Sequence, residues 1–152
     1  MKRQKRFWLI RIVAILLVAS LISPAPAFAA TSDVVQPLAS LYLTSYTTYI
    51  GSIDHGRIQV WFRVTGTGYM TDIGVLSIRL YESTDNVNWT RVETFLHEDY
   101  SNMLSHNDSH HMSYIEYQGV AGRYYKAYVG IWAGNGTSGD TRYMWTPVEQ
   151  AT

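Results

Sequence analysis

Strict alternation between apolar and other residues along three stretches of this chain constrains its fold more than any other feature. The first apolar row consists of Ile58, Val60, Phe62 and Val64. It alternates with Arg57, Gln59, Trp61 and Arg63. Successive side chains of a β-strand point to opposite faces, so a period of two predicts a strand with one apolar face turned inward. Two further stretches predict inward rows of the same kind: Leu76, Ile78 and Leu80, and then Tyr125, Ala127, Val129, Ile131 and Ala133.

Weaker strand signals and chain breakers complete this pattern. We expect strands at about 38–49, 89–96, 112–118 and 141–148, where aromatic and β-branched residues are frequent. Turn-forming residues gather between the strands, at 51–56, 65–68, 84–88, 119–122 and 134–139. About seven short strands without helical periodicity predict an all-β fold, an antiparallel β-sandwich.

The first 29 residues have the order of a secretory signal peptide. Four basic residues lie within the first six positions, an apolar run follows at 12–22 after Arg11, and prolines at 24 and 26 precede Ala27, Phe28 and Ala29. Small residues one and three positions before a cut predict cleavage after Ala29. The run of about 11 residues is shorter than the ~20 that a spanning helix needs, although an uncleaved anchor stays open as an alternative. We expect a signal peptide at 1–29, a flexible lead-in at 30–37 and a β-sandwich domain at 38–149.

Removal of this leader changes the charge of the chain. The whole sequence has 12 basic and 12 acidic residues, but five basic residues and no acidic one lie in the leader. The mature chain therefore has seven basic residues against twelve acidic ones, and its single lysine is Lys126. Such a surface has no means of collecting phosphates, so we expect no nucleic-acid partner. The absence of cysteine excludes disulfides and thiol chemistry. We expect a protein that is secreted to the extracellular side and has no stable membrane association after leader cleavage.

Two segments hold motifs with local chemistry. Residues 81–89 predict a hairpin turn, because Asp85 and Asn86 follow Ser83 and can bond their own backbone, while Trp89 opens the return strand. Residues 97–111 are predicted to be a loop that holds four of the five histidines and three carboxylates, a set that suits zinc. His106, Asp108 and His110 would share one side of an extended segment, but no motif with established ligand spacing occurs. We therefore assign no metal site and no cofactor.

The candidate binding residues are aromatic side chains that alternate with the inward rows: Trp61, Tyr81, Tyr124, Tyr128 and Trp132. Exposed rings beside polar donors such as Arg63, Arg79 and Lys126 form surfaces on which sugar rings and peptide strands stack. The alternative is that these rings only cover the sheet or are buried by the histidine segment, because large aromatic residues are usually well buried.

Motifs of catalysis are missing from the sequence. It contains no Gly-x-Ser-x-Gly elbow, phosphate loop, dinucleotide fingerprint or cysteine nucleophile. The adjacent carboxylates Glu98 and Asp99 would point to opposite faces of a strand, so nothing sets the separation that glycoside hydrolysis requires. We expect no enzymatic activity.

Four segments carry a resemblance: 73–83, 89–92, 117–129 and 139–142. With the leader, they resemble a group of small secreted proteins of Gram-positive anaerobic bacteria whose function is not established. The resemblance implies strands and hairpins of a fibronectin-like or immunoglobulin-like sandwich, and implies nothing catalytic. We expect a non-catalytic extracellular binding module for carbohydrate, cell-wall material or an extended peptide. The competing interpretations are a structural or envelope-associated protein without a small ligand, and a metal-dependent activity at the histidine segment.

Overall fold

The computed structural model describes residues 40–152, and the predicted signal peptide and lead-in lie outside them. The fold of the described residues is all-β and consists of seven antiparallel strands in one hydrogen-bonded sheet, with no α-helix among them. The strands are β1 (Leu43–Ser52), β2 (Arg57–Ser83), β3 (Thr90–Leu96), β4 (Leu104–Gln118), β5 (Tyr124–Gly134), β6 (Gly139–Trp145) and β7 (Glu149–Gln150). Two short 3-10 turns, η1 (Asp54–Gly56) and η2 (Ser101–Met103), precede β2 and β4. The predicted all-β antiparallel fold is confirmed.

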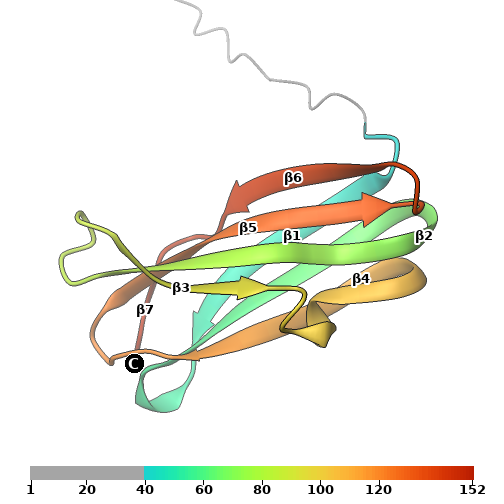
Figure 1. Cartoon of the computed structure of the whole chain (residues 1–152). Helices are drawn as coiled ribbons and strands as arrows, with labels where there is room; N and C mark the ends of the chain where they lie inside the picture. Colours follow the sequence, from blue (N-terminus) through green and yellow to red (C-terminus); the bar gives the residue numbers. More distant parts are fainter. Residues whose placement is uncertain (1–39) are drawn as a thin grey trace, which may run out of the picture. The chain divides into compact units, whose positions relative to one another are not determined.

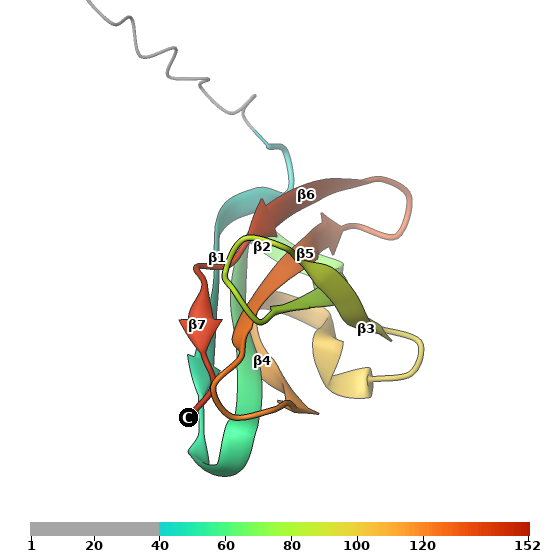
Figure 2. The same ribbon diagram turned by 90° about the vertical axis from the view of Figure 1, so that its left-hand side faces the viewer.

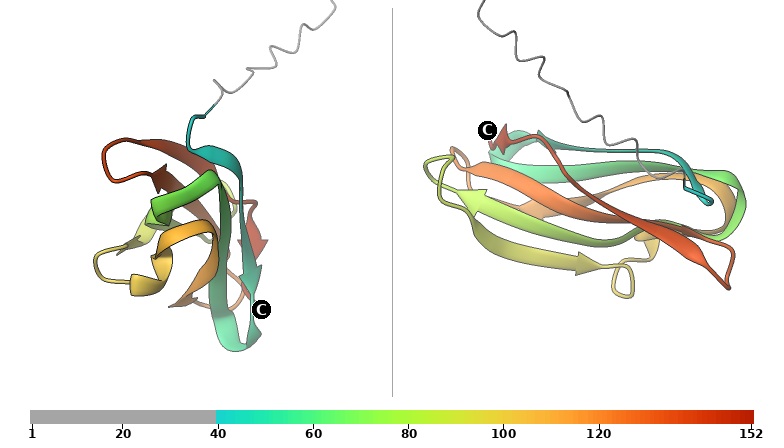
Figure 3. Two further views of the ribbon diagram at one scale, coloured as in Figure 1. Left: turned by 90° about the vertical axis from the view of Figure 1, so that its right-hand side faces the viewer. Right: turned by 90° about the horizontal axis from the view of Figure 1, so that it is seen from above.

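The 27-residue strand β2 organises the sheet, because it pairs with four other strands. Residues 58–66 of β2 pair with β1, and residues 57–74 pair with β4. Residues 72–83 pair with β5, and residues 77–82 pair with β3. Figure 1 shows β2 turning back at one end of the molecule, where β4 also bends. The sheet is therefore partly curled, and Figures 2 and 3 show its strands arranged around the interior.

This bend corrects one prediction. The segment 65–68 was expected to separate two strands, but it lies within β2, and the pairing of β2 with β4 shifts register between Thr65 and Met70. A side-chain carbon added at Gly66 would lie 3.0 Å from the backbone oxygen of Gly68, so the backbone is tightly folded here. The ladder between β2 and β4 is interrupted over residues 66–69 and resumes at Met70, so the breakers bend the strand without ending it.

The inward rows predicted from the alternation form the core. All residues of the first and third rows are at most 1% exposed, and Ile78 and Leu80 of the second row are fully buried. Leu76 was expected to point inward as well, but it is half-buried, and Val75 is fully buried in its place. The pairing of β2 with β5 shifts between Val75 and Ser77, so a bulge reverses the alternation at this point.

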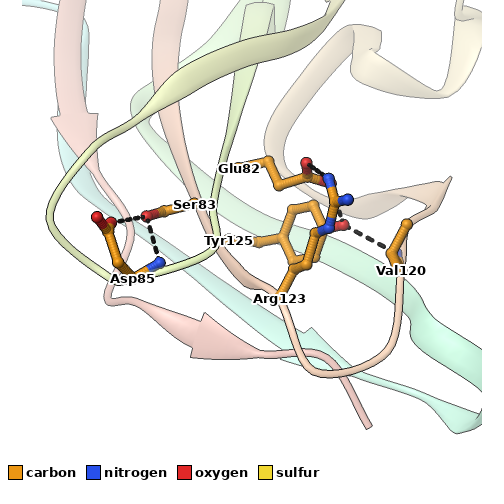
Figure 4. A network of polar contacts seen from close by, with 6 residues as sticks. All are labelled: Glu82, Ser83, Asp85, Val120, Arg123 and Tyr125. Atoms are coloured by element: carbon orange, nitrogen blue, oxygen red, sulfur yellow. Dashed lines mark hydrogen bonds and ion pairs between the residues drawn. The ribbon is translucent and has the colours of Figure 1, made fainter.

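The hairpin between β2 and β3 has the predicted turn chemistry. The Asp85 carboxylate accepts hydrogen bonds from the Val87 and Asn88 N–H groups at 2.9 and 2.8 Å, and from the Asn88 amide at 2.7 Å. The Ser83 hydroxyl donates to the same carboxylate at 2.9 Å and accepts from the Asp85 N–H (Figure 4). Asn86 has a φ of 58°, which asparagine tolerates better than most residues. These bonds, led by the Asn88 N–H, hold the pKa of Asp85 well below its ordinary value.

Acidification is expected to weaken this turn. A carboxyl group whose pKa is lower in the folded chain stabilises the fold above its unfolded pKa of about 3.9, and this contribution is lost as pH falls further. Urea unfolding of Asp85→Asn should therefore show a shallower fall of the midpoint below pH 4 than the parent chain. Asp99→Asn, at an exposed turn position, is the control and should keep the parent profile. An unchanged profile in Asp85→Asn would contradict the assignment.

A partly buried polar network closes the same end of the sheet. The fully buried Tyr125 donates its hydroxyl proton to Oε2 of Glu82 at 2.5 Å and accepts the Val120 N–H at 2.8 Å (Figure 4). Arg123 donates to the other oxygen of Glu82. Burial, and then the bond to Glu82, raise the pKa of Tyr125 to about 12. The network thus fixes the 119–123 turn to β2.

Candidate functional site

Three aromatic side chains form a row across the outer face of β1, β2 and β4. Tyr49 is the register partner of Trp61, and Trp61 is the register partner of Tyr114. The Tyr49 and Trp61 rings are parallel within 3°, with centroids 5.9 Å apart, and the Trp61 and Tyr114 centroids are 4.5 Å apart. Tyr49 is 50% exposed and Tyr114 is 38% exposed. We call these three residues the aromatic row.

Polar side chains support one flank of the aromatic row. The indole Nε1 of Trp61 donates to Oε1 of Gln59 at 3.0 Å. The amide of Gln59 then donates to Oε1 of Glu116, its register partner on β4, at 2.7 Å. This chain of bonds fixes the amide and restricts the orientation of the Trp61 ring. Preorganised rings lose less conformational entropy when a ligand binds.

The other flank of the aromatic row is hollowed. A depression of about 230 Å³ is lined by Thr47, Tyr49, Trp61, Phe62, Arg63 and Met112. A second, more polar depression of about 440 Å³ shares Arg63 and Met112 with the first and is also lined by Asp108, His110 and His111. An apolar surface therefore passes directly into a surface that carries charges.

Arg63 and Asp108 carry the formal charges in these depressions. Arg63 is exposed, and its Nη2 lies 3.3 Å from the Met112 sulfur. Within residues 40–152, no carboxylate lies within 4.0 Å of this guanidinium. Asp108 accepts the backbone N–H groups of Ser109 and His110 at 2.7 and 3.3 Å, and these bonds, with that of His110 first, lower its pKa. The Asp108 charge is thus compensated locally, whereas Arg63 has no acidic partner among the described residues.

The histidine segment differs from its prediction, because 104–111 belongs to strand β4 instead of a loop. His106 Nδ1 lies 2.6 Å from Asp72 Oδ1, whereas His110 Nδ1 lies 3.6 Å from Asp108 Oδ1. Asn107, between them, has a φ of 53°, which interrupts the alternation of the strand. His106, Asp108 and His110 therefore do not converge, and residues 40–152 contain no group of three or more histidines and carboxylates placed to hold a metal ion.

A second aromatic group lies on the outer face of β2, β5 and β6. The Tyr128 ring contacts Tyr143 and Trp145 with centroid distances of 5.5 and 4.8 Å, and Tyr81 contacts Trp145 at 5.2 Å. Lys126 places its Nζ 4.0 Å from the Trp89 ring centroid and 4.9 Å from that of Trp145. The chain's own ammonium group already occupies these indole faces, at a distance typical of cation–π contacts.

The five predicted binding residues therefore do not form one site. Trp61 belongs to the aromatic row, while Tyr81 and Tyr128 belong to the second group. Tyr124 pairs with Gln150 of β7, at the far end of β5 from Trp132. Trp132 packs over the β5–β6 turn, where a side-chain carbon added at Gly134 or Gly139 would lie within 2.6 Å of its indole. Trp132 follows Tyr124 by eight positions along the strand, which corresponds to roughly 26 Å.

Sequence reasoning missed two members of the aromatic row, Tyr49 and Tyr114. Each lies in an alternating stretch: Tyr49 between the buried Thr48 and Ile50, and Tyr114 before the buried Ile115. The alternation of β1 and β4 was available as a signal that both rings point outward. Their positions opposite Trp61 depend on strand register, which the sequence did not specify.

Comparisons with known proteins do not assign this chain to a family. No family model matches the sequence, and no curated protein matches it. The solved structure of the sporulation control protein Spo0M from Bacillus subtilis is similar with a TM-score of 0.40 and 10% identity, over 71% of this chain and 49% of that chain. A family 76 glycoside hydrolase from a bovine Bacteroides thetaiotaomicron strain is similar with a TM-score of 0.33 and 14% identity, over 72% of this chain and 20% of that chain. Neither likeness is close enough to assign a function.

Proposed function

We propose that this chain is an exported, non-catalytic carbohydrate-binding module, whose binding surface is the aromatic row of Tyr49, Trp61 and Tyr114. The observation that carries the proposal is the alignment of these three rings across three strands beside an apolar depression. A pyranose ring has an apolar face of C–H groups and a rim of hydroxyls. Aromatic rings stack on the C–H face of the sugar, because the faces of the rings are electron-rich. The sugar hydroxyls can bond the donors and acceptors of Gln59, Glu116 and Arg63.

An extended peptide fits this surface less well than a saccharide. A peptide that adds to a sheet needs the free N–H and C=O groups of a sheet edge. The aromatic row crosses the face of the sheet, and the β2 backbone beneath it is paired on both sides, with β1 and β4. A peptide on this face would lose hydration of its backbone groups without backbone partners. Binding of peptides in preference to glycans would contradict the proposal.

The finer fold assignment is also a proposal: we infer an immunoglobulin-like or fibronectin-like sandwich. Its first support is that buried residues from both halves of β2 belong to a single apolar cluster. Its second is Tyr125, near the start of β5, whose hydroxyl accepts the backbone N–H of Val120 five residues upstream. A tyrosine bonded in this way resembles the tyrosine corner of such sandwiches.

Export rests on the leader at 1–29, which lies outside the described residues. The lack of cysteine and of catalytic motifs supports a role in which the aromatic row binds a ligand without catalysing a reaction. Within residues 40–152, no helix is long and apolar enough to cross a membrane. The resemblance to secreted proteins of Gram-positive anaerobes stays a prediction. A structural or envelope-associated role remains the competing interpretation, and it predicts no glycan affinity.

Affinity electrophoresis against a panel of soluble polysaccharides, with pull-down on insoluble cell-wall material, tests the proposal. Trp61→Ala should weaken binding by roughly tenfold or more, because central aromatic residues dominate binding energies. Tyr143→Ala is the control, since Tyr143 is an exposed ring of the second aromatic group and lies outside the aromatic row. Tyr114→Ala provides a second variant, and urea midpoints check that each variant is folded. No binding to any polysaccharide, or equal losses in Trp61→Ala and Tyr143→Ala, would overturn the proposal.

A further inference from the structure

The position of Arg63 bears on the class of carbohydrate. It follows Trp61 by two residues on β2 and points to the same face, so the two side chains are about 6.6 Å apart along the strand. Its register partner on β4 is Met112, and these two residues are shared by both depressions. A ligand stacked on the Trp61 ring would therefore extend toward the guanidinium.

Charges around the aromatic row are arranged unequally. On one flank, the Glu116 carboxylate accepts the Gln59 amide, which is held by Trp61. On the other flank, Arg63 has the thioether of Met112 as its neighbour, and a thioether is only a weak acceptor. Asp108 lines the second depression, but its Oδ1 accepts the backbone N–H groups of Ser109 and His110, and its Oδ2 accepts the Ser105 hydroxyl. The guanidinium therefore keeps its capacity to bind an anion.

Two other cationic side chains, Arg123 and Lys126, differ from Arg63 because their contacts stabilise the fold. Arg123 is paired with Glu82, and Lys126 lies between the rings of Trp89 and Trp145. Both serve the fold, by fixing the 119–123 turn and by covering the second aromatic group. Arg63 instead borders a depression beside exposed rings.

We infer that the ligand of the aromatic row is an acidic polysaccharide, in which the carboxylate of a uronic acid pairs with Arg63 while a sugar ring stacks on Trp61. The inference rests on the proposed carbohydrate-binding function and adds the class of sugar. A guanidinium matches a carboxylate with two parallel hydrogen bonds, which a neutral hydroxymethyl group cannot form. The chain carries an excess of acidic residues after leader removal, so long-range attraction to a polyanion is absent. Recognition must then come from this local pair.

Matched polymers separate the inference from the proposed function. The probes are polygalacturonate and alginate, each compared with its carboxyl-reduced form, which has the same linkages but neutral sugars. We expect the parent chain to bind at least one uronate polymer roughly tenfold more tightly than its reduced form, a difference of about one charge-assisted hydrogen bond. Arg63→Met should remove this preference and leave binding to the reduced polymer unchanged. Arg79→Met, at another exposed arginine of β2, is the control and should keep the preference.

The outcomes are distinct. Equal binding of acidic and reduced polymers by the parent chain overturns the inference and leaves the proposed function standing. A preference that survives in Arg63→Met also overturns it, because the carboxylate would then be recognised elsewhere. Absence of binding to all four polymers, and to the wider panel, overturns the proposed function itself.

Discussion

Replacing Tyr125 by alanine is expected to unfold most of the protein or to leave it only marginally stable. Tyr125 is fully buried, and its ring packs against Tyr117 with centroids 6.2 Å apart. Loss of a buried aromatic side chain costs about 3–5 kcal/mol, because the cavity collapses only in part. The hydroxyl adds to this, since its removal deprives Val120 of an acceptor and Glu82 of a donor. Domains of this kind have only about 5–15 kcal/mol of stability in total.

Two companion variants separate packing from polar contributions. Tyr125→Phe keeps the ring and should cost about 1–3 kcal/mol, the penalty of leaving buried polar groups without a partner. Tyr124→Ala is the control, because Tyr124 is the adjacent residue of β5 and points outward. Urea unfolding followed by circular dichroism gives all three values. If Tyr125→Ala were no more destabilising than Tyr124→Ala, the assigned inward row of β5 would be wrong.

The second large effect is expected at Gly74. This residue has a φ of +148° and lies in β2 between Leu104 of β4 and Trp132 of β5. An added side-chain carbon would lie 2.2 Å from the backbone oxygen of Met103, whose side chain is fully buried. Since both the backbone conformation and the contact oppose any side chain, Gly74→Ala should cost roughly 2–6 kcal/mol. We expect a large fall of the urea midpoint and loss of β4 protection in hydrogen exchange.

Gly51 offers a matched control in the same sheet. It lies in β1, and a side-chain carbon added there would meet nothing within 4 Å. Gly51→Ala should therefore be neutral, or stabilise the fold by about 0.4–1 kcal/mol, because alanine restricts the unfolded chain. A Gly74→Ala variant as stable as Gly51→Ala would contradict the described packing of η2 against β2.

Local patterns predicted much of this fold, and the exceptions have physical causes. The row from Ile58 to Val64 was predicted correctly, because alternation depends only on the neighbours of each residue. Leu76 was misplaced, since the bulge beside it arises from pairing with β5. The segment 65–68 contains turn formers, and residues 66–69 have no register partner on β4, yet pairing with β4 resumes at Met70 and the segment lies within one long strand. Pairing with β4 on both sides of this segment depends on residues distant in sequence, so the local pattern alone divided a strand that the sheet keeps as one.

The candidate site was less predictable than the core. Trp61 was identified as an outward ring, but the sequence grouped it with Tyr81, Tyr124, Tyr128 and Trp132, which the structure places on other parts of the surface. The alternation along one strand shows which side chains point outward. It does not show which outward side chains of different strands lie next to one another. Tyr49 belongs to β1, which directly precedes β2 in the sequence, whereas Tyr114 belongs to β4, which follows β2 only after β3.

By itself, the sequence determined the class of secondary structure, the inner side of the main strands and the Asp85 turn, because each depends on residues within a few positions of one another. The tertiary structure decided which outer side chains meet. It aligned Tyr49, Trp61 and Tyr114, and it placed Lys126 against the faces of two indoles. It also placed Arg63 beside the aromatic row with no carboxylate of residues 40–152 within ion-pair distance. The physical reason is register. A shift of one residue between paired strands reverses every outward side chain, and that register is fixed by the packing of the whole core.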